Sequence, residues 1–565
     1  MSSTPSLSEL YTPKLVTILR EGYTRRNFRS DLIAGLTVAV VALPLSMAIA
    51  IASGVSPAQG LHTAIIGGIL VSLLGGSRFQ VGGPAGAFIV VVATTVQLHG
   101  LDGLMLATVL AGLLLVLAGF LKLGTYIKFI PYPVTVGFTA GIAMIIFASQ
   151  VKDLLGLTLA QAEPVALLEK LRVIGASLPT FNPATVVLAV ATILIIVAIK
   201  RFRPQWPGML LAVAACSAAA ALLDLPLATI GSVFGGIPRS LPAPSLPDVS
   251  FLKLQAVFPS AVSFALLGSI ESLLSAVVAD GMTGRRHRSN CELVAQGVAN
   301  IVSGLFGGIC VTGLIARTAT NVRAGAHGPV AGMLHGVFLL LFVVVAAPLA
   351  SYIPLASLAG ILTVVAWNMI DRHAIAMLMR ASRGDAVVLL ATFLVTIFRD
   401  LGTGILVGFS IGALLFIHRM STTTAISAKL PPVPEDRADD ANGGRTPYDE
   451  SGAADPGVVV FRISGAFFFG AAAAIGSVFD RIGETCQTLV VDLSAVPFLD
   501  STAAQTLDGL ARRCNRRGVA LVLTGTLPEV RRQLVAYGLG EPRVRYDMAA
   551  GLPAGKAATG GTSSS

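Results

Sequence analysis

The sequence has few charged residues, which occupy only 12% of its 565 positions. A soluble globular protein carries about 25%. Hydrophobic residues make up 54% of the chain, and long apolar runs follow one another between Asp31 and Arg419. A membrane-spanning helix needs roughly 20 mostly apolar residues. This composition excludes an ordinary soluble domain for most of the chain and predicts an integral membrane protein.

Cysteine is also scarce, and the five cysteines show no spacing typical of a metal site or a disulfide framework. Residues 1–30 are polar with a basic run up to Arg29, so no signal peptide is predicted. The formal charge of +10 would suit nucleic acid, but the basic residues cluster at the ends of apolar runs, as membrane topology requires. We therefore expect no metal, no cofactor, no nucleic-acid partner and no enzymatic activity.

The apolar runs predict fourteen membrane segments in two sets of seven, because each run is long enough to cross or enter the lipid. The first set covers 31–51, 58–75, 84–98, 103–121, 129–151, 184–199 and 207–223, and the second covers 257–280, 291–307, 312–321, 330–350, 353–370, 385–398 and 402–418. Lysine and arginine cluster before the first segment and after the fourth, sixth, eighth, twelfth and fourteenth, which all lie on one predicted side of the membrane. The positive-inside rule then places the N-terminal segment 1–30 and the end of the transmembrane region 31–420 in the cytoplasm.

Two predicted segments are too short to cross a bilayer. At 1.5 Å rise per residue, 84–98 covers roughly 22 Å and 312–321 roughly 15 Å, against a hydrocarbon core of about 30 Å. Glycine-rich sequence precedes each one, and each is the third segment of its set of seven. Short, interrupted segments at matching positions in two halves indicate the binding site of a transporter.

A helix that begins inside the membrane presents free N–H groups and a partial positive charge, which favour an anion. Pro84 suits the first position of such a helix, with free N–H groups predicted from Ala85 to Ala87. Gly313 to Ile315 would offer the same in the second segment. The alternative is that both segments are ordinary helices kinked at glycine.

Three side chains in the apolar runs could serve an anion site. Arg317 lies about one turn into the second short helix, where its guanidinium could bind a carboxylate or sulfate bidentately. Glu271 lies inside the eighth segment and could bind and release a proton, with Ser275 one turn further on the same face. The alternative is a structural ion pair in which Glu271 only fixes Arg317.

Other polar residues are weaker candidates. His62 and His335 could relay protons, although satisfied core histidines are the commoner case. Gln296, Asn300 and Asn321 are expected to tie helices together.

The composition changes after the last apolar run. Residues 421–455 are rich in Thr, Pro, Asp and Gly, which is typical of a linker. Strand and helix patterns then alternate over 456–550, which predicts a small cytoplasmic α/β domain; its elements are strands 458–463, 488–493 and 519–523 and helices 471–484, 501–516 and 527–536. The tail 551–565 has a disordered composition.

Ser501 stands at the start of the predicted helix 501–516 of this domain, in Asp500-Ser501-Thr502. A helix N-terminus favours a phosphate, so Ser501 is a candidate regulatory phosphorylation site. The alternative is a plain helix N-cap.

The motifs resemble those of the SulP (sulfate permease-like) anion transporters along almost the whole chain. Gly60–Ala64 through Gly75–Arg78 is similar to the family signature, with Gln59 and His62 where tyrosines are usual, and Val81–Gly86 is similar to the family's S-G-P-T/A segment. Val491–Ser494 and Val496–Ser501 resemble a STAS domain.

The resemblance implies a seven-plus-seven inverted-repeat fold shared with uracil transporters, elevator-like movement, a homodimer in the inner membrane and a cytoplasmic partner of the STAS domain. It also implies substrate contacts at the two short segments and on the first segment. Carried onto this chain, these are Gly83, Pro84, Ala85, Gly86, Ala87, Gly313, Leu314, Ile315, Ala316, Arg317, Leu45 and Met47, with Glu271 and Ser275 beside them.

Within the family, Glu271–Gly284, Arg317–Gly328 and Val365–Met369 look most like the bacterial C4-dicarboxylate branch. The resemblance therefore predicts proton-coupled uptake of succinate, fumarate or aspartate. Sodium coupling is disfavoured, because the sodium-dependent bicarbonate members carry Asp at position 271 and lack the arginine. The alternatives are a sulfate or bicarbonate transporter, an anion channel, or a sensor that acts through its STAS domain.

Overall fold

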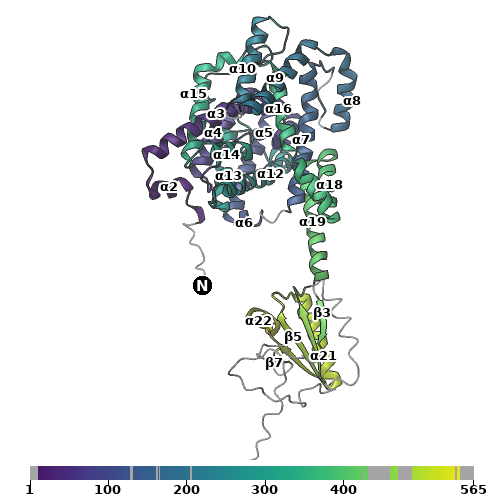
Figure 1. Cartoon of the computed structure of the whole chain (residues 1–565). Coiled ribbons are helices and arrows are strands. Elements are labelled where there is room, and N and C mark those ends of the chain that lie inside the picture. The colour runs from purple at the N-terminus through teal and green to yellow at the C-terminus, as the bar shows by residue number, and fades with distance from the viewer. Residues whose placement is uncertain are drawn as a thin grey trace, which may run out of the picture. The chain divides into compact units, whose positions relative to one another are not determined.

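The computed structural model describes residues 10–127, 131–160, 163–164, 166–203, 206–423, 425–429, 458–468, 487–536, 538–540 and 544–547. The chain divides into two compact units, Met1–Ser410 and Ile411–Ser565. The first is helical, and the second contains a β-sheet (Figure 1).

Within the described residues, the first unit is a succession of α-helices. They are α2 (Lys14–Gly22), α3 (Arg25–Ala52), α4 (Pro57–Leu74), α5 (Ile89–Phe120), α6 (Gly124–Ile127), α7 (Tyr132–Leu155), α8 (Leu167–Ser177), α9 (Pro183–Phe202), α10 (Gly208–Leu222), α11 (Ile230–Phe234), α12 (Phe251–Thr283), α13 (Ser289–Leu305), α14 (Ile315–Arg323), α15 (Val330–Ala350), α16 (Leu355–Met369), α17 (Arg372–Ala381), α18 (Arg383–Phe398) and α19 (Leu401–Thr423), the last of which runs into the second unit. Two 3₁₀ turns, η1 (Gly86–Phe88) and η2 (Leu178–Thr180), and two short strands, β1 (Gly82–Gly83) and β2 (Thr312–Gly313), complete it.

Among the described residues, nine helices are long and apolar enough to cross a membrane. Each of the fourteen predicted segments coincides with helical structure, but the third and fourth run together in α5 across a kink at Gly100 (φ 69°, ψ −172°). Fourteen crossings and a seven-plus-seven repeat stay predictions. The multi-pass helical membrane architecture is plain.

Capping residues explain where several of these helices begin. Ser56 and Gln59 form a capping box at the start of α4, with Pro57 at the first helical position. The side chain of Thr24 accepts a hydrogen bond from Asn27 N at 3.3 Å and caps α3. Helix α3 therefore begins at Arg25, inside the segment 1–30 that was predicted to precede the membrane region.

The helices pack as two groups. Helices α3, α4, α5, α12, α13, α14 and α15 contact one another, and α7, α9, α10, α16 and α18 form a second set of contacts. Small residues allow close approach in the first group: a Cβ on Gly112 of α5 would lie 2.6 Å from Gly297 O of α13, and a Cβ on Gly297 would lie 2.6 Å from Gly112 O. Such small-residue crossings are typical of helices packed in a membrane.

Strands β1 and β2 pair antiparallel inside the first group, with Gly82 opposite Gly313 and Gly83 opposite Thr312. Glycine is required at Gly82 and Gly313 because neighbouring atoms leave no room for a Cβ atom. A Cβ on Gly82 would lie 2.6 Å from Gly67 O, and one on Gly313 would lie 1.8 Å from Gln80 Nε2. The pairing brings two segments that are far apart in the sequence into contact.

The short helices begin later than the sequence indicated. Pro84 is not the first helical residue, because Ala85 is extended (φ −112°, ψ 146°) and the 3₁₀ turn η1 starts at Gly86. In the second segment Leu314 is the N-cap residue and α14 starts at Ile315, not at Thr312. In the second segment β2 takes up Thr312 and Gly313, the residues expected to open the helix. In the first segment β1 ends at Gly83, and the chain stays extended at Ala85 before η1 begins.

The second unit has a five-stranded sheet in the order β3-β4-β5-β6-β7. Within the described residues, its strands are β3 (Ala425–Lys429), β4 (Val458–Ser464), β5 (Thr488–Ala495), β6 (Ala520–Thr524) and β7 (Arg545–Asp547), and its helices are α21 (Ser501–Arg517) and α22 (Pro528–Ala536). Strand β3 is antiparallel to β4, and the other pairs are parallel. Its core joins sheet residues such as Val491 and Leu523 to Leu507 of α21.

Strand β3 corrects the prediction of a linker over 421–455. Ala425–Lys429 lacks a hydrophobic run, and it is a strand because it pairs with β4 along the edge of the sheet. The rest of that linker from 430, the predicted helix 471–484 and the tail 551–565 lie outside the described residues.

Candidate functional site

The two short segments are joined by more than their strand pairing. Leu314 N donates to Val81 O at 3.1 Å, and Val81 N donates to Thr318 Oγ1 at 3.2 Å. The starts of η1 and α14 are therefore held close to each other, as the glycine-rich stretches in the sequence suggested. The kinked-helix alternative does not describe them, because each segment contains a strand and a separate helix start.

Arg317 is the largest side chain that is fully buried in the described structure, and it is 1% exposed. Its Nη2 donates to Ser46 Oγ at 2.8 Å. Its Nε and Nη1 have no hydrogen-bond partner among the described residues. A Cβ on Gly83 would lie 2.5 Å from Nη1, so the guanidinium lies against the backbone of β1 and keeps two free donors.

Glu271 on α12 does not pair with Arg317. Its Oε2 is enclosed and has no hydrogen-bond partner in the described part of the chain, and the ion pair considered from the sequence is not formed in this conformation. The carboxyl group is thus left available for a proton.

Ser275 has a different contact from the one expected of a proton-coupling residue. Its hydroxyl donates to Thr318 Oγ1 at 3.0 Å, so it joins α12 to α14. One turn earlier on α12, Ser272 Oγ accepts a hydrogen bond from Gln80 Nε2 at 2.7 Å. The two serines connect α12 to both short segments.

Glu292 is a functional candidate that the sequence reasoning missed. It is 0% exposed on α13, and its Oε2 accepts from Ser77 N at 3.0 Å. Its Oε1 accepts from Gln80 Nε2 at 3.0 Å and from Gln296 Nε2 at 3.1 Å. The criterion that singled out Glu271, a carboxyl group inside an apolar segment, applies equally to Glu292.

Ser46 is the second residue that was missed. The resemblance implied Leu45 and Met47 on either side of it, and both are buried in the apolar core. Ser46 Oγ instead accepts from Arg317 Nη2 and donates to Ala42 O at 2.7 Å. A lone serine in an apolar helix gives little signal in a sequence, because Ser commonly bonds its own helix backbone.

The weaker polar candidates divide into two kinds. Asn300 accepts from Val311 N at 2.9 Å and donates to Val311 O at 2.8 Å, and Asn321 donates to Phe79 O at 2.9 Å. These contacts tie segments together as predicted. His62 and His335 are buried, and the ring nitrogens of both lack a hydrogen-bond partner among the described residues, so the expected satisfied core histidine describes neither.

In the second unit, Asp500 rather than Ser501 is the N-cap of α21. The Asp500 carboxylate accepts from Ala503 N at 2.9 Å, and Ser501 is the first helical residue. Ser501 is exposed, and its phosphorylation stays a prediction.

Comparison with known proteins identifies both units. The profile of the sulfate permease family matches residues 28–392, and that of the STAS domain matches 453–544. The putative sulfate transporter YvdB of Bacillus subtilis is 41% identical over 523 residues, which cover 92% of this chain and 95% of that protein. The bicarbonate transporter BicA of Picosynechococcus is 33% identical over 528 residues, with 90% of each chain covered.

Solved structures show the same architecture. Murine Slc26a9 in the inward-facing state aligns with a TM-score of 0.83 at 20% identity, over 97% of this chain and 94% of that one, which shows the fold alone. The transmembrane domain of a cyanobacterial BicA aligns with a TM-score of 0.61 at 33% identity, over 68% of this chain and 98% of that one.

The predicted likeness to the C4-dicarboxylate branch is not supported, because these relatives are named for sulfate and bicarbonate. The family itself follows from the length of the match and from the motifs around the two short segments. The chain belongs to the sulfate permease family of membrane anion transporters and carries a C-terminal STAS domain.

Proposed function

We propose that this protein is a carrier of small inorganic oxyanions, with sulfate as the first candidate, and that the anion binds at Arg317 between η1 and α14. The observation that carries the proposal is the buried guanidinium with two free nitrogens, Nε and Nη1. A planar guanidinium binds the oxygens of a sulfate or carboxylate in a bidentate manner.

The burial of Arg317 favours a ligand over a purely structural role. A buried charge is costly unless it is paired, and the only hydrogen-bond partner of Arg317 within the described residues is the hydroxyl of Ser46. An anion would supply the missing negative charge. The N-terminus of α14 at Ile315 and that of η1 at Gly86 would add free N–H donors.

Bicarbonate is the second candidate, because the BicA relatives match over 90% of this chain. Sodium coupling is disfavoured, since Arg317 already supplies a fixed positive charge at the site. We propose that a proton is the coupling ion and that Glu271 carries it, because its enclosed Oε2 has no partner within the described structure.

The membrane location, topology and assembly of the carrier are also proposals. The basic clusters at the ends of the apolar segments support an inner-membrane protein with cytoplasmic N- and C-termini. A homodimer and a cytoplasmic partner of the STAS domain rest on the family resemblance.

Uptake into proteoliposomes tests the proposal. Labelled sulfate, bicarbonate and succinate would each be offered with no gradient, with an inward proton gradient and with a sodium gradient. We expect saturable sulfate uptake, counterflow and stimulation by the proton gradient, with Arg317→Ala as the inactive control.

Other outcomes would change the assignment. Uptake of succinate alone would restore the dicarboxylate reading, and sodium-driven bicarbonate uptake would contradict both the first substrate and the coupling ion. Linear flux that does not saturate would indicate a channel. A chain truncated before residue 440 should keep residual uptake, and its complete loss would favour a sensor that works through the STAS domain.

A further inference from the structure

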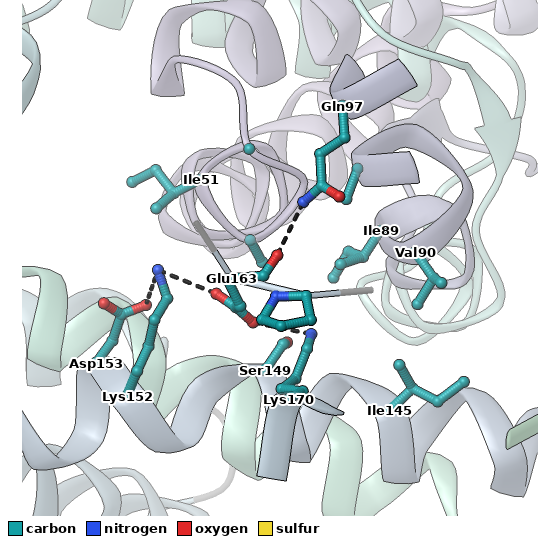
Figure 2. Close-up of a pocket in the computed structure, with 14 residues that line it drawn as sticks. Ile51, Ile89, Val90, Gln97, Ile145, Ser149, Lys152, Asp153, Glu163 and Lys170 are labelled. Atoms are coloured by element: carbon teal, nitrogen blue, oxygen red, sulfur yellow. Dashed lines mark hydrogen bonds and ion pairs between the residues drawn. The ribbon is translucent and has the colours of Figure 1, made fainter. Parts of the chain in front are cut away.

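The helical unit contains a charged cavity that Arg317 does not line. Figure 2 shows it between the end of α3, the first turns of α5, helix α7 and the start of α8. Its volume is about 190 Å³. Ile51, Ile89 and Ile145 supply apolar walls, and Lys152 and Lys170 supply positive charge.

The two lysines of this cavity hold one carboxylate, that of Glu163. Lys170 Nζ lies 2.8 Å from Glu163 Oε1, and Lys152 Nζ lies 3.2 Å from Glu163 Oε2. Each oxygen therefore has its own ammonium group, as Figure 2 shows. Asp153 approaches Lys152 less closely, at 3.9 Å.

The contacts of Glu163 link the two helix groups. Its backbone carbonyl accepts from Gln97 Nε2 of α5 at 3.0 Å, while its side chain is held by Lys152 of α7 and Lys170 of α8. Lys170 is 7% exposed, so its charge is shielded from solvent and depends on the paired carboxylate.

Two residues that line the cavity connect it to η1, one of the two elements at the proposed anion site. Ile89, which lines it, directly follows η1. Ile145, which also lines it, precedes Ile146, whose Cδ1 lies 3.3 Å from the place of a Cβ on Gly86. The first turn of α5 and the facing turn of α7 thus border both places. The predicted topology puts this end of α3 and α7 on the outer side of the membrane.

We propose that Lys152 and Lys170 form an external site for a small oxyanion, and that the Glu163 carboxylate occupies this site in the present conformation. The inference rests on the proposed transport function and names the place where the anion first binds. Two ammonium groups that each bind one carboxylate oxygen offer the charge and spacing that a sulfate or bicarbonate needs. When Glu163 leaves, Asp153 alone offsets the two lysines and the cavity becomes net positive.

Kinetics measured separately from each face of the membrane test the site. Glu163→Gln should lower the KM for external sulfate about 5-fold, because the amide competes less well for the lysines. The double variant Lys152→Gln, Lys170→Gln should raise the external KM by a factor of about ten or more. The KM measured from the inner face should stay unchanged in both.

Lys253→Gln is the matched control. Lys253 is a lysine paired to a carboxylate, Asp248, at 2.6 Å, it lies on the same predicted side of the membrane, and it does not line the cavity. Its loss should move neither KM. Equal shifts at both faces, or an unchanged external KM in Glu163→Gln, would overturn the proposal.

Lysine labelling separates this proposal from the transport function. An amine-reactive reagent that cannot cross the membrane would be applied from outside to the full chain, and Lys152 and Lys170 would be quantified by mass spectrometry. In Glu163→Gln, labelling should rise, and sulfate or bicarbonate should reduce it at these two lysines but not at Lys253.

The two hypotheses can then fail separately. Protection by an oxyanion without transport would contradict the proposed function and support the external site. Transport without protection would overturn the external site and leave the proposed function in place.

Discussion

The two short segments of the helical unit, Val81–Phe88 and Thr312–Arg323, can be compared directly because they pair through β1 and β2. The first contains only apolar residues and glycines, and the second carries Arg317, Thr318 and Asn321. The first therefore offers backbone N–H groups and room for close approach, while the second supplies the charge. The difference indicates that an anion would be bound by two unlike halves of one site.

The segments also differ in how they are held. The residues before β1 are held by a residue of another helix, because Ser77 N and Gln80 Nε2 donate hydrogen bonds to Glu292 of α13. The second segment is fixed by its own side chains, because Arg317 contacts Ser46 and Thr318 contacts Ser275. Mutations in the first segment should thus act through steric clashes or a loss of stability. Mutations in the second segment should act through a loss of charge.

Removal of the charge in the second segment should have the largest effect. Arg317→Ala is expected to reduce oxyanion uptake at least about 100-fold, since a charge-assisted bidentate contact and its anion are lost. Arg317→Lys should recover little, because an ammonium lacks the planar pair of donors. Uptake in proteoliposomes measures both, and wild-type rates in Arg317→Ala would refute the site.

A side chain added to the first segment should have the next largest effect. In Gly83→Ala the new Cβ would lie 2.5 Å from Arg317 Nη1, which must displace the guanidinium. We expect uptake to fall about 10-fold, the cost of a displaced contact of roughly 1.4 kcal/mol.

Gly86→Ala is the control for this steric effect. Its Cβ would meet only flexible side chains, Ile146 Cδ1 at 3.3 Å and Met369 Sδ at 3.9 Å, so uptake should change by less than about 2-fold. Equal losses of uptake in Gly83→Ala and Gly86→Ala would show that displacement of the Arg317 guanidinium is not the cause.

Glu271 lies on α12, the helix that contacts both segments, and its replacement should change the pH profile rather than the site. A proton-coupled carrier speeds up as the external pH falls. Glu271→Gln mimics the protonated carboxyl group, so uptake should become flat with pH while sulfate still binds. Uptake measured over a range of external pH values tests this. An unchanged profile would exclude Glu271 as the proton carrier.

Glu292→Gln should act on stability through the anchor of the first segment. The carboxylate accepts hydrogen bonds from Ser77 N, Gln80 and Gln296, and a neutral amide cannot accept all of them. Each unsatisfied buried donor costs about 1–3 kcal/mol, so the apparent melting temperature in detergent should fall by several degrees. The pH profile of the remaining uptake should keep its shape.

The smallest effect is expected at the ion pair between Glu21 of α2 and Arg78, at 2.5 Å. The hydrogen bond from Arg78 holds the pKa of the Glu21 carboxyl group below its usual range. A carboxyl group whose pKa is lowered in the folded state stabilises the protein at pH values above its unfolded-state pKa. This stabilisation is lost as the pH falls through the folded-state pKa.

Solvent screens this pair, because the Glu21 side chain is 48% exposed. Glu21→Gln should therefore cost at most about 1 kcal/mol near neutral pH, and the difference from wild type should vanish in acid. Melting curves at several pH values would show it. If wild type and Glu21→Gln differed in melting temperature by the same amount down to low pH, the charge of Glu21 would not be the cause of the difference.

Several features followed from the sequence by a general physical rule. Apolar runs must span lipid as helices, so the helical segments were predicted closely from hydrophobicity. Glycine-rich interruptions at matching positions marked the two short segments, and the strand–helix alternation marked the α/β unit. Arg317 and Glu271 were found because ionisable residues inside apolar runs are rare.

The missed features depend on contacts between distant residues. Ser46 and strand β3 matter because of what they touch, and no local pattern reveals a hydrogen bond from α14 to α3. Glu292 is the exception, because it met the local criterion that found Glu271. The late helix starts at Gly86 and Ile315 also depend on a distant contact, since each helix follows a strand of the β1–β2 pair.

The sequence by itself determined a helical membrane transporter with a C-terminal α/β domain, because hydrophobicity and periodicity are local properties. Only the tertiary structure decided that Arg317 keeps free donors instead of pairing with Glu271. It also decided that the Glu163 carboxylate lies between Lys152 and Lys170. Which charges meet depends on how the helices pack, and the helix packing joins residues that the sequence keeps far apart.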